Sequence, residues 1–272
     1  MGVIDPAMIH ALGVRIVDHD HLADRPAEHA AVQTSTIAAI VDGNYDGDVT
    51  IGELLEAGDL GIGTLDGLDG EVIIVDGEAW QAAYDGSVRK IASHQRTPFA
   101  VVTKFSTDDL VEIEEPIGWG ALLALLEEHA PPDSGCDAIR IDGHFSRVHA
   151  RSVPKQSKPY PPLVEVTAGQ VEWEFEGVEG TVVGFRFPEA VSGVEVVGHH
   201  LHFISSDRTR GGHVLECDVE KATVRIEELD EMRIELPPGV PLPESEDVAR
   251  EAALRRAEQP SGEPPASSRL DS

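Results

Sequence analysis

The sequence predicts an α/β (α+β) protein of two domains, with mixed β-sheets and few helices. Three observations favour this fold class. Short apolar segments separated by Asp-Gly turns recur through the first half, few segments carry helix caps, and the second half consists almost entirely of strand-like segments. A Pro-rich run over residues 154–162 separates the two halves and is expected to be the crossing between them.

The first half begins with two short helices and continues as a β-meander. Thr34-Ser35-Thr36 provides a cap for a helix over 37–40, and Gly58 ends a second helix over 53–57. Asp-Gly pairs are typical of tight turns between antiparallel strands. After the two helices, the sequence predicts strands over 71–75, 79–84, 87–91 and 99–103. A helix over 117–129, which ends before two prolines, and a strand over 137–141 follow them.

Six further strands are expected in the second half, over 171–175, 180–187, 194–205, 213–217, 222–226 and 232–236, followed by a helix over 246–258. The predicted domain organisation is an N-terminal, partly disordered extension (1–33), an α/β domain (34–162), a β-rich domain (163–258) and a disordered tail rich in Pro and Ser (259–272).

Composition excludes several classes of function. The chain has 272 residues with 21 Lys and Arg against 50 Asp and Glu, so its formal net charge of −29 disfavours nucleic acid and anionic membranes as partners. Its longest apolar runs, such as 120–126, fall far short of the roughly 20 residues that a membrane span needs. No basic leader is evident, so we expect a cytoplasmic protein with Cys136 and Cys217 reduced. Adaptation to high salt and a GC-rich genome both remain open as explanations of the charge.

Three histidines form the sharpest chemical pattern of the sequence. His200 and His202 stand two residues apart on a predicted strand, so both imidazoles point to one face of the sheet. A hairpin centred between Asp207 and Arg208 brings His213 opposite His202, with the Cβ atoms about 5 Å apart. Three imidazoles with an open fourth position are typical of catalytic zinc, so the sequence predicts a metal site on a β-hairpin of the second half. Separate, hydrogen-bonded sheet histidines are the alternative.

A cupin-like metal site also uses a His-x-His pair, together with a carboxylate that follows within a few residues. Here the residues that follow offer only Asp207, which lies in the turn. A calcium loop is a further alternative, because residues 42–53 match its string of acidic and glycine positions. We do not expect calcium there, because residues 49–51 are predicted to be a strand where such a loop needs flanking helices.

The whole chain resembles the acetolactate decarboxylase family over about residues 34–258. The segments that carry the resemblance, in the family's order, are Thr50–Leu55, Gly58–Thr64, Leu68–Glu71, Thr97–Phe99, Arg151–Gln156, Lys158–Tyr160, Gly184–Arg186, His200–Ile204 and Gly211–His213. Each is an ordinary turn or strand pattern by itself, but their joint order is specific. His199 departs from the family, which usually has an aromatic residue there.

The resemblance implies a zinc-dependent enzyme that converts 2-acetolactate to acetoin and carbon dioxide, and commonly a homodimer. It places the metal ligands at His200, His202 and His213, and substrate-pocket positions at Thr64, Glu71 and Arg151. A C-terminal glutamate completes the pocket; it is assigned to Glu258, with Glu251 as the alternative.

The chemistry of the substrate is consistent with these residue types. A β-keto acid loses carbon dioxide into its own ketone, so no pyridoxal or thiamine cofactor is needed. The planar guanidinium of Arg151 suits the carboxylate, while Glu71 or Glu258 is the candidate acid that protonates the product. Two other functions remain open: a non-catalytic, metal-binding sensory protein on the same scaffold, and a cupin-like metal oxygenase.

Overall fold

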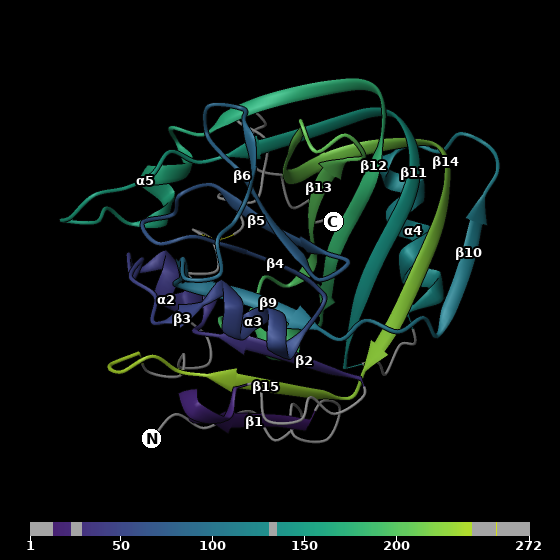
Figure 1. The fold of residues 1–272 in the computed structure, drawn as a ribbon. Helices are drawn as coiled ribbons and strands as arrows, with labels where there is room; N and C mark the ends of the chain where they lie inside the picture. The colour runs from purple at the N-terminus through teal and green to yellow at the C-terminus, as the bar shows by residue number, and fades with distance from the viewer. Residues whose placement is uncertain (1–12, 23–28, 131–134, 241–253, 255–272) are drawn as a thin grey trace, which may run out of the picture.

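The computed structural model describes residues 13–22, 29–130, 135–240 and 254. Two large β-sheets form most of this part of the protein (Figure 1). The first sheet has the strand order β1 (Gly13–Val17), β15 (Glu231–Glu235), β2 (Ala30–Thr34), β9 (Phe99–Thr103), β4 (Leu60–Thr64), β5 (Glu71–Val75), β6 (Glu78–Ala82) and β7 (Val88–Lys90). Its β1, β15 and β2 run parallel to one another, and its other neighbouring strands are antiparallel.

The second sheet is antiparallel and closes on itself at one end. Its strand order is β10 (Asp109–Ile113), β14 (Gly211–Leu229), β11 (Cys136–Ser152), β12 (Val171–Phe187) and β13 (Gly198–Ser205). The start of β14 also pairs with β13, so β11, β12, β13 and β14 surround a common interior there. A separate two-stranded pair joins β3 (Val49–Thr50) to β8 (Arg96–Thr97).

Helices are few, as the sequence predicts. Within the described ranges they are α2 (Ile37–Val41), α3 (Ile51–Ala57), α4 (Trp119–His129) and α5 (Leu163–Thr167), with the 3-10 turns η1 (His19–His21) and η2 (Glu189–Val191). The caps explain where the first two begin. Thr36 accepts a hydrogen bond from the backbone N–H of Ala39, and Thr50 and Glu53 form a reciprocal capping box.

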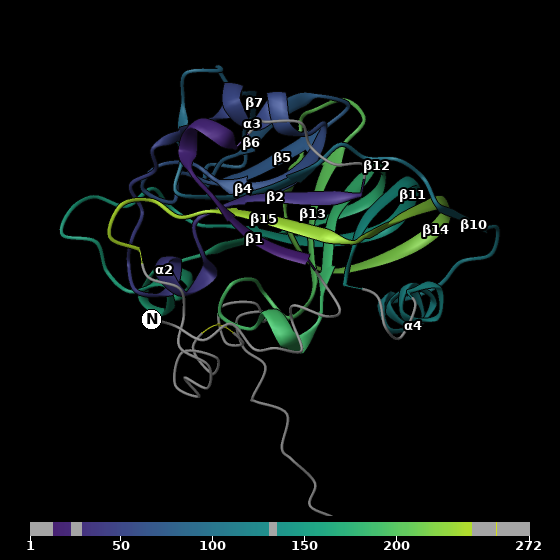
Figure 2. The ribbon, with the colours of Figure 1, turned by 90° about the horizontal axis from the view of Figure 1, so that it is seen from below.

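Three of the hydrophobic clusters of the described residues hold these layers together. Ile62 and Ile73 of the first sheet pack against Val183 and Phe185 of the second, so the two sheets share one core. Helix α3 covers the other face of the first sheet. Helix α4 packs through Leu122 and Leu126 on the second sheet, and Figure 2 shows it nearly end-on beside β14.

Several strands of the structure are longer than the predicted ones or have different ends. Strand β12 runs without interruption through both 171–175 and 180–187, and β14 does the same through 213–217 and 222–226. Long strands remain paired there because β11 lies between β12 and β14 and hydrogen bonds to both. Strand β13 begins at Gly198 rather than at Val194.

The two sheets take strands from both sides of residue 162. Strands β10 and β11 precede it and lie in the second sheet, whereas β15 follows it and lies in the first. The segment 1–33 contains β1, η1 and most of β2. The domain boundaries themselves stay a prediction. The tail (259–272) lies outside the described residues, as does the helix over 246–258 except for Leu254, which is helical and buried.

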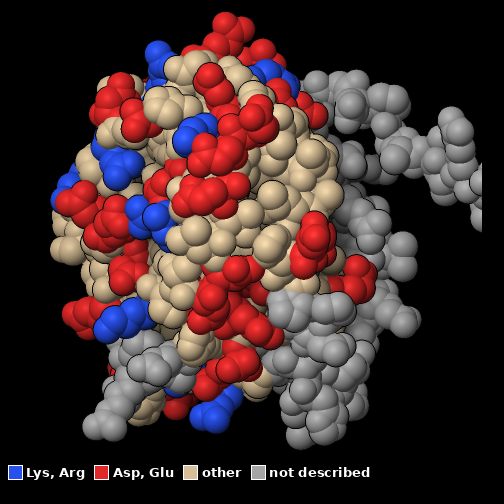
Figure 3. Space-filling model, turned by 90° about the vertical axis from the view of Figure 1, so that its right-hand side faces the viewer, with Lys and Arg blue, Asp and Glu red and all other residues tan. Residues whose placement is uncertain are grey.

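Acidic side chains mark the surface, as the net charge of −29 requires. On the face shown in Figure 3, patches of Asp and Glu lie beside scattered Lys and Arg. In the described part of the chain, no helix has the length and apolar character that crossing a membrane requires.

Glu227 is a buried carboxyl near the junction of the sheets, and we expect it to make stability depend on pH. It is 0% exposed, it accepts a hydrogen bond from the Ser106 N–H at 3.2 Å, and Nδ1 of His29 lies 3.4 Å from it. Burial raises its pKa from 4.5 to about 7. The native state therefore holds a proton that the unfolded chain releases between these values, so stability is lost as pH rises through that window.

Replacing Glu227 tests this expectation. The free energy of unfolding should fall by up to about 3 kcal/mol between pH 5 and pH 8 on account of this group, and Glu227→Gln should remove that part of the decrease. Urea unfolding at both pH values measures it. Glu220→Gln, an exposed position on the same strand, is the control. An unchanged pH dependence in Glu227→Gln would contradict the expectation.

Candidate active site

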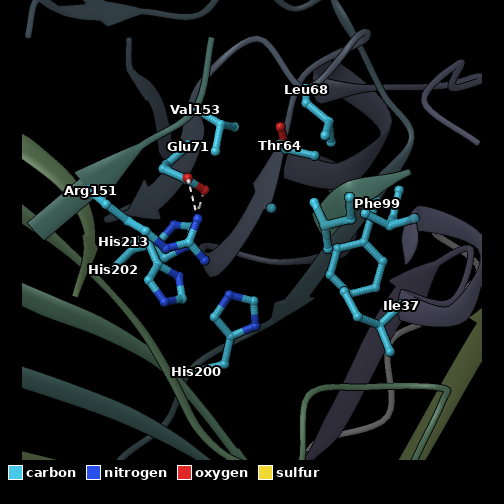
Figure 4. A pocket seen from close by; sticks show the side chains of 13 residues that line it. Ile37, Thr64, Leu68, Glu71, Phe99, Arg151, Val153, His200, His202 and His213 are labelled. Carbon is cyan, nitrogen blue, oxygen red and sulfur yellow. Dashed lines mark ion pairs between the residues drawn. The ribbon is translucent and has the colours of Figure 1, made fainter. Parts of the chain in front are cut away.

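Three histidines meet where β13 and β14 pair. His200 and His202 lie on the same face of β13, and the strand register puts His202 opposite His213, as the hairpin spacing predicts. The ring centroids are 5.1 to 5.4 Å apart, and one nitrogen of each ring lies within 4.8 Å of the other two. Figure 4 shows the three rings converging at one end of a pocket.

His202 is held in the form that suits a metal ligand. It is 1% exposed, and its Nδ1 donates to the Val72 carbonyl at 2.9 Å, because a carbonyl oxygen can only accept. Burial, followed by the neighbouring His200 and His213, lowers its pKa well below 6.5, so the ring stays neutral. Its Nε2 is buried and makes no hydrogen bond within the described residues. A neutral imidazole with one nitrogen fixed and the other directed at two more imidazoles fits a metal ion.

Two buried charges from different sheets lie beside the histidines. Arg151 of β11 pairs in register with His213, and Glu71 comes from β5 of the first sheet. Nη1 of Arg151 lies 3.8 Å from Oε1 of Glu71, and Nε2 of His202 lies 3.6 Å from Oε2. The two charged residues are only 5% and 7% exposed. Glu71 therefore faces both the guanidinium and His202 (Figure 4).

Thr64 lies next to Glu71, because β4 and β5 pair these two residues directly. Its hydroxyl donates to the Gly70 carbonyl at 2.8 Å and is buried. With its proton engaged in this way, the hydroxyl oxygen presents acceptor lone pairs to the pocket.

The C-terminal candidates, Glu251 and Glu258, lie outside the described residues. Leu254, between them in sequence, is 8% exposed. It belongs to the hydrophobic cluster that also contains Ile37 and Phe99.

One pocket collects six of the predicted residues, and it has an apolar side that sequence reasoning did not assign to the site. Figure 4 shows Ile37 and Phe99 across the pocket from the histidines. The full lining is Ile37, Ile40, Gly63, Thr64, Leu68, Glu71, Phe99, Arg151, Val153, Leu163, His200, His202 and His213. Leu68, Phe99 and Val153 lie inside segments that carry the family resemblance, which is the signal that could have identified them.

Other candidates in the sequence lie away from this cluster. His199 faces the opposite way, with Nε2 3.8 Å from Glu127 of α4, and burial lowers its pKa. Cys217 is buried in the core beneath α4, where burial raises the pKa of its thiol to about 12. Neither belongs to the metal-binding group.

Two carboxylates of the calcium-loop string at 42–53 make other contacts. Asp46 forms an ion pair with Lys158 and accepts a hydrogen bond from the Tyr160 hydroxyl at 2.9 Å. Glu53 accepts from the Thr50 N–H at 2.8 Å as part of the helix cap. Two of the side chains that such a loop needs are therefore engaged in structural contacts.

Comparison with known proteins agrees with this pocket. The family model for alpha-acetolactate decarboxylase matches residues 32–241. An alpha-acetolactate decarboxylase of Methylococcus capsulatus is 43% identical over 210 residues, covering 77% of this chain and 81% of its relative. The enzyme of Methanosarcina mazei is 42% identical over 211 residues, covering 78% and 73%. The crystal structure of the Bacillus subtilis strain 168 enzyme superimposes with a TM-score of 0.81 at 35% identity, covering 85% of this chain and 100% of that one.

Fold, pocket and relatives thus agree, and the chain belongs to the alpha-acetolactate decarboxylase family of carboxy-lyases.

Proposed function

We propose that this protein decarboxylates 2-acetolactate to acetoin and carbon dioxide, for acetoin and butanediol synthesis, with Zn²⁺ held by His200, His202 and His213. One observation carries the proposal: a buried guanidinium and a buried carboxylate lie beside a three-histidine cluster in a single pocket. Family membership supports the reaction, and the neutral, partly unbonded His202 supports the metal.

Zinc is the ion that three imidazoles with an open position suit best. Bound there, it would act as a Lewis acid that stabilises the negative charge developing on the substrate oxygens.

Arg151 binds the substrate carboxylate. Its planar guanidinium offers paired donors to a carboxylate, and its burial keeps this interaction away from competing water. The contact with Glu71 fixes its direction before substrate arrives. When carbon dioxide leaves, the electron pair passes into the neighbouring ketone and gives an enediolate, so the chain needs no further electron sink.

A carboxyl group on one side of the pocket donates a proton to the enediolate. Glu71 and Glu258 are the candidates, since each supplies a positioned acid. Thr64 accepts a hydrogen bond from a substrate hydroxyl, and the methyl groups of the substrate lie against the apolar side formed by Ile37 and Phe99.

Two alternative functions are less well supported. A non-catalytic metal-binding protein needs neither a residue that binds the substrate carboxylate nor an acid that protonates the product. Arg151 and Glu71 nevertheless lie directly beside the histidines. A cupin-like oxygenase would have a redox-active metal ion in place of zinc, and metal analysis of the purified protein distinguishes it.

We also propose a homodimer that works in the cytoplasm on this small molecule without nucleic-acid or membrane partners. The net charge of −29 supports the absence of polyanionic partners. The molar mass that light scattering gives for the protein as it elutes from a gel-filtration column determines the oligomeric state.

Removal of the metal should abolish the reaction. Carbon dioxide and acetoin release from racemic 2-acetolactate should fall to the uncatalysed rate after chelation and return when zinc is added. Circular dichroism before and after chelation controls for unfolding. Undiminished release from folded, metal-free protein would contradict the role of zinc.

Arg151→Lys should reduce kcat/KM by about a hundredfold or more, because an ammonium cannot reproduce the paired donors of the guanidinium. Arg147→Lys is the matched control, since Arg147 lies on the same strand but forms ion pairs with Glu174 and Glu216. Steady-state kinetics on both variants provides the comparison. Equal losses in both would point to a general effect on β11.

Replacing the two C-terminal glutamates separates their roles. Glu258→Gln should lower kcat by about a hundredfold or more if this carboxyl acts as the acid, while Glu251→Gln should leave it nearly unchanged. Acetoin release and the enantiomeric excess of the product are measured for both. The opposite ranking would assign the pocket position to Glu251.

A further inference from the structure

A second group of potential metal ligands lies at the end of the first sheet that is formed by β1, β15 and β2. Strands β1, β15 and β2 run parallel and side by side (Figure 2), and their register aligns Val17, Glu235 and Thr34 at one edge. Because η1 follows β1 directly, His19 lies at this edge too. The carboxyl ends of parallel strands thus bring together residues from the start and the end of the described chain.

His19, Asp48 and Glu235 each direct one ligand atom at the others, with all three atoms within 4.8 Å of one another. Nδ1 of His19 lies 3.8 Å from Oε1 of Glu235. Glu235 is only 2% exposed, and its Oε2 accepts a hydrogen bond from the Thr34 hydroxyl at 2.6 Å, so its orientation is fixed. Asp48 enters from the segment that leads into β3.

Two atoms of this group lack the partners that burial demands. Oδ1 of Asp48 and Nδ1 of His19 are buried and make no hydrogen bond among the residues that the structure describes. The two carboxylates also repel each other, because their oxygens lie within 4.8 Å of one another and Glu235 is buried. A cation among these three atoms would satisfy both lone pairs and remove the repulsion.

The remaining neighbour of His19 fits a ligand role for the imidazole. Oε1 of Glu53 lies 3.4 Å from Nε2 of His19, on the opposite side of the ring from Glu235. A carboxylate in this position holds the proton on Nε2, which leaves the lone pair of Nδ1 for a metal ion. Glu53 is itself held by the capping box with Thr50.

We propose that His19, Asp48 and Glu235 bind a second divalent transition-metal ion, Zn²⁺ or Mn²⁺, separate from the three-histidine site. One imidazole with two carboxylates is a donor set that both ions accept. The ion ties β1 and η1 to the body of the first sheet. His19 precedes the region matched by the family model, which begins at residue 32, so the extension of this chain supplies one of the ligands.

Zinc stoichiometry tests the proposal in the full-length protein. The chain is stripped with chelator, reloaded with Zn²⁺, passed through gel filtration and analysed for bound metal. We expect about two ions per chain in the parent protein and about one in Asp48→Asn and in His19→Gln, which is only partly buried and should fold. Both variants should keep acetoin release, because they lie outside the pocket.

Two further variants show which site each bound zinc ion occupies. Glu56→Gln removes the same charge from an exposed position on α3 and should still bind two ions, which excludes unspecific binding to an acidic protein. His202→Ala should lose the ion of the pocket and keep the second one. One ion in the parent and none in Asp48→Asn would support the second site while removing zinc from the proposed function. An equal count in the parent, Asp48→Asn and His19→Gln would overturn the second site.

Discussion

The register of β14 is the constraint on which the active-site pocket depends. His213 lies near the start of this strand and is paired twice, with His202 of β13 on one side and with Arg151 of β11 on the other. A shift by one residue would turn His213 to the opposite face and separate it from both partners. The closure of the second sheet at this end therefore fixes an imidazole cluster and a guanidinium together, using backbone hydrogen bonds rather than loops.

The first sheet completes the pocket through polar contacts from β5. Val72 accepts a hydrogen bond from His202 across the interface between the sheets, and Glu71, its neighbour in β5, lies next to Arg151 as a result. Each buried charge helps to compensate the other, because an isolated carboxylate or guanidinium would be costly at this depth. The shared apolar core around Ile73 and Phe185 holds the sheets at the distance that these contacts require.

Local signals in the sequence predicted some of these features and missed others for identifiable reasons. The cap at Thr36 and the pairing of His202 with His213 follow from spacing within a few residues, and they are confirmed. The capping box of Thr50 and Glu53 was not predicted, and it starts the second helix at Ile51 rather than at Glu53. Strand β4 was not expected, because Gly61 and Gly63 are typical of turns. They are needed because a Cβ at either position would come within 2.5 Å of a carbonyl oxygen on β9. Such close approach is a property of strands distant in sequence, as is the apolar side of the pocket.

The position of β15 has a consequence for the way the chain folds. This strand lies near the end of the described sequence, yet it is inserted between β1 and β2, which lie near its beginning. During synthesis the edge of β2 stays uncovered until residues 231–235 have left the ribosome, so the first sheet is completed among the last steps. An unpaired edge with the fully buried sequence of β2 is a template for association between nascent chains. The topology therefore makes folding slow and non-local. The first half of the nascent chain needs protection from association until the second half has been synthesised.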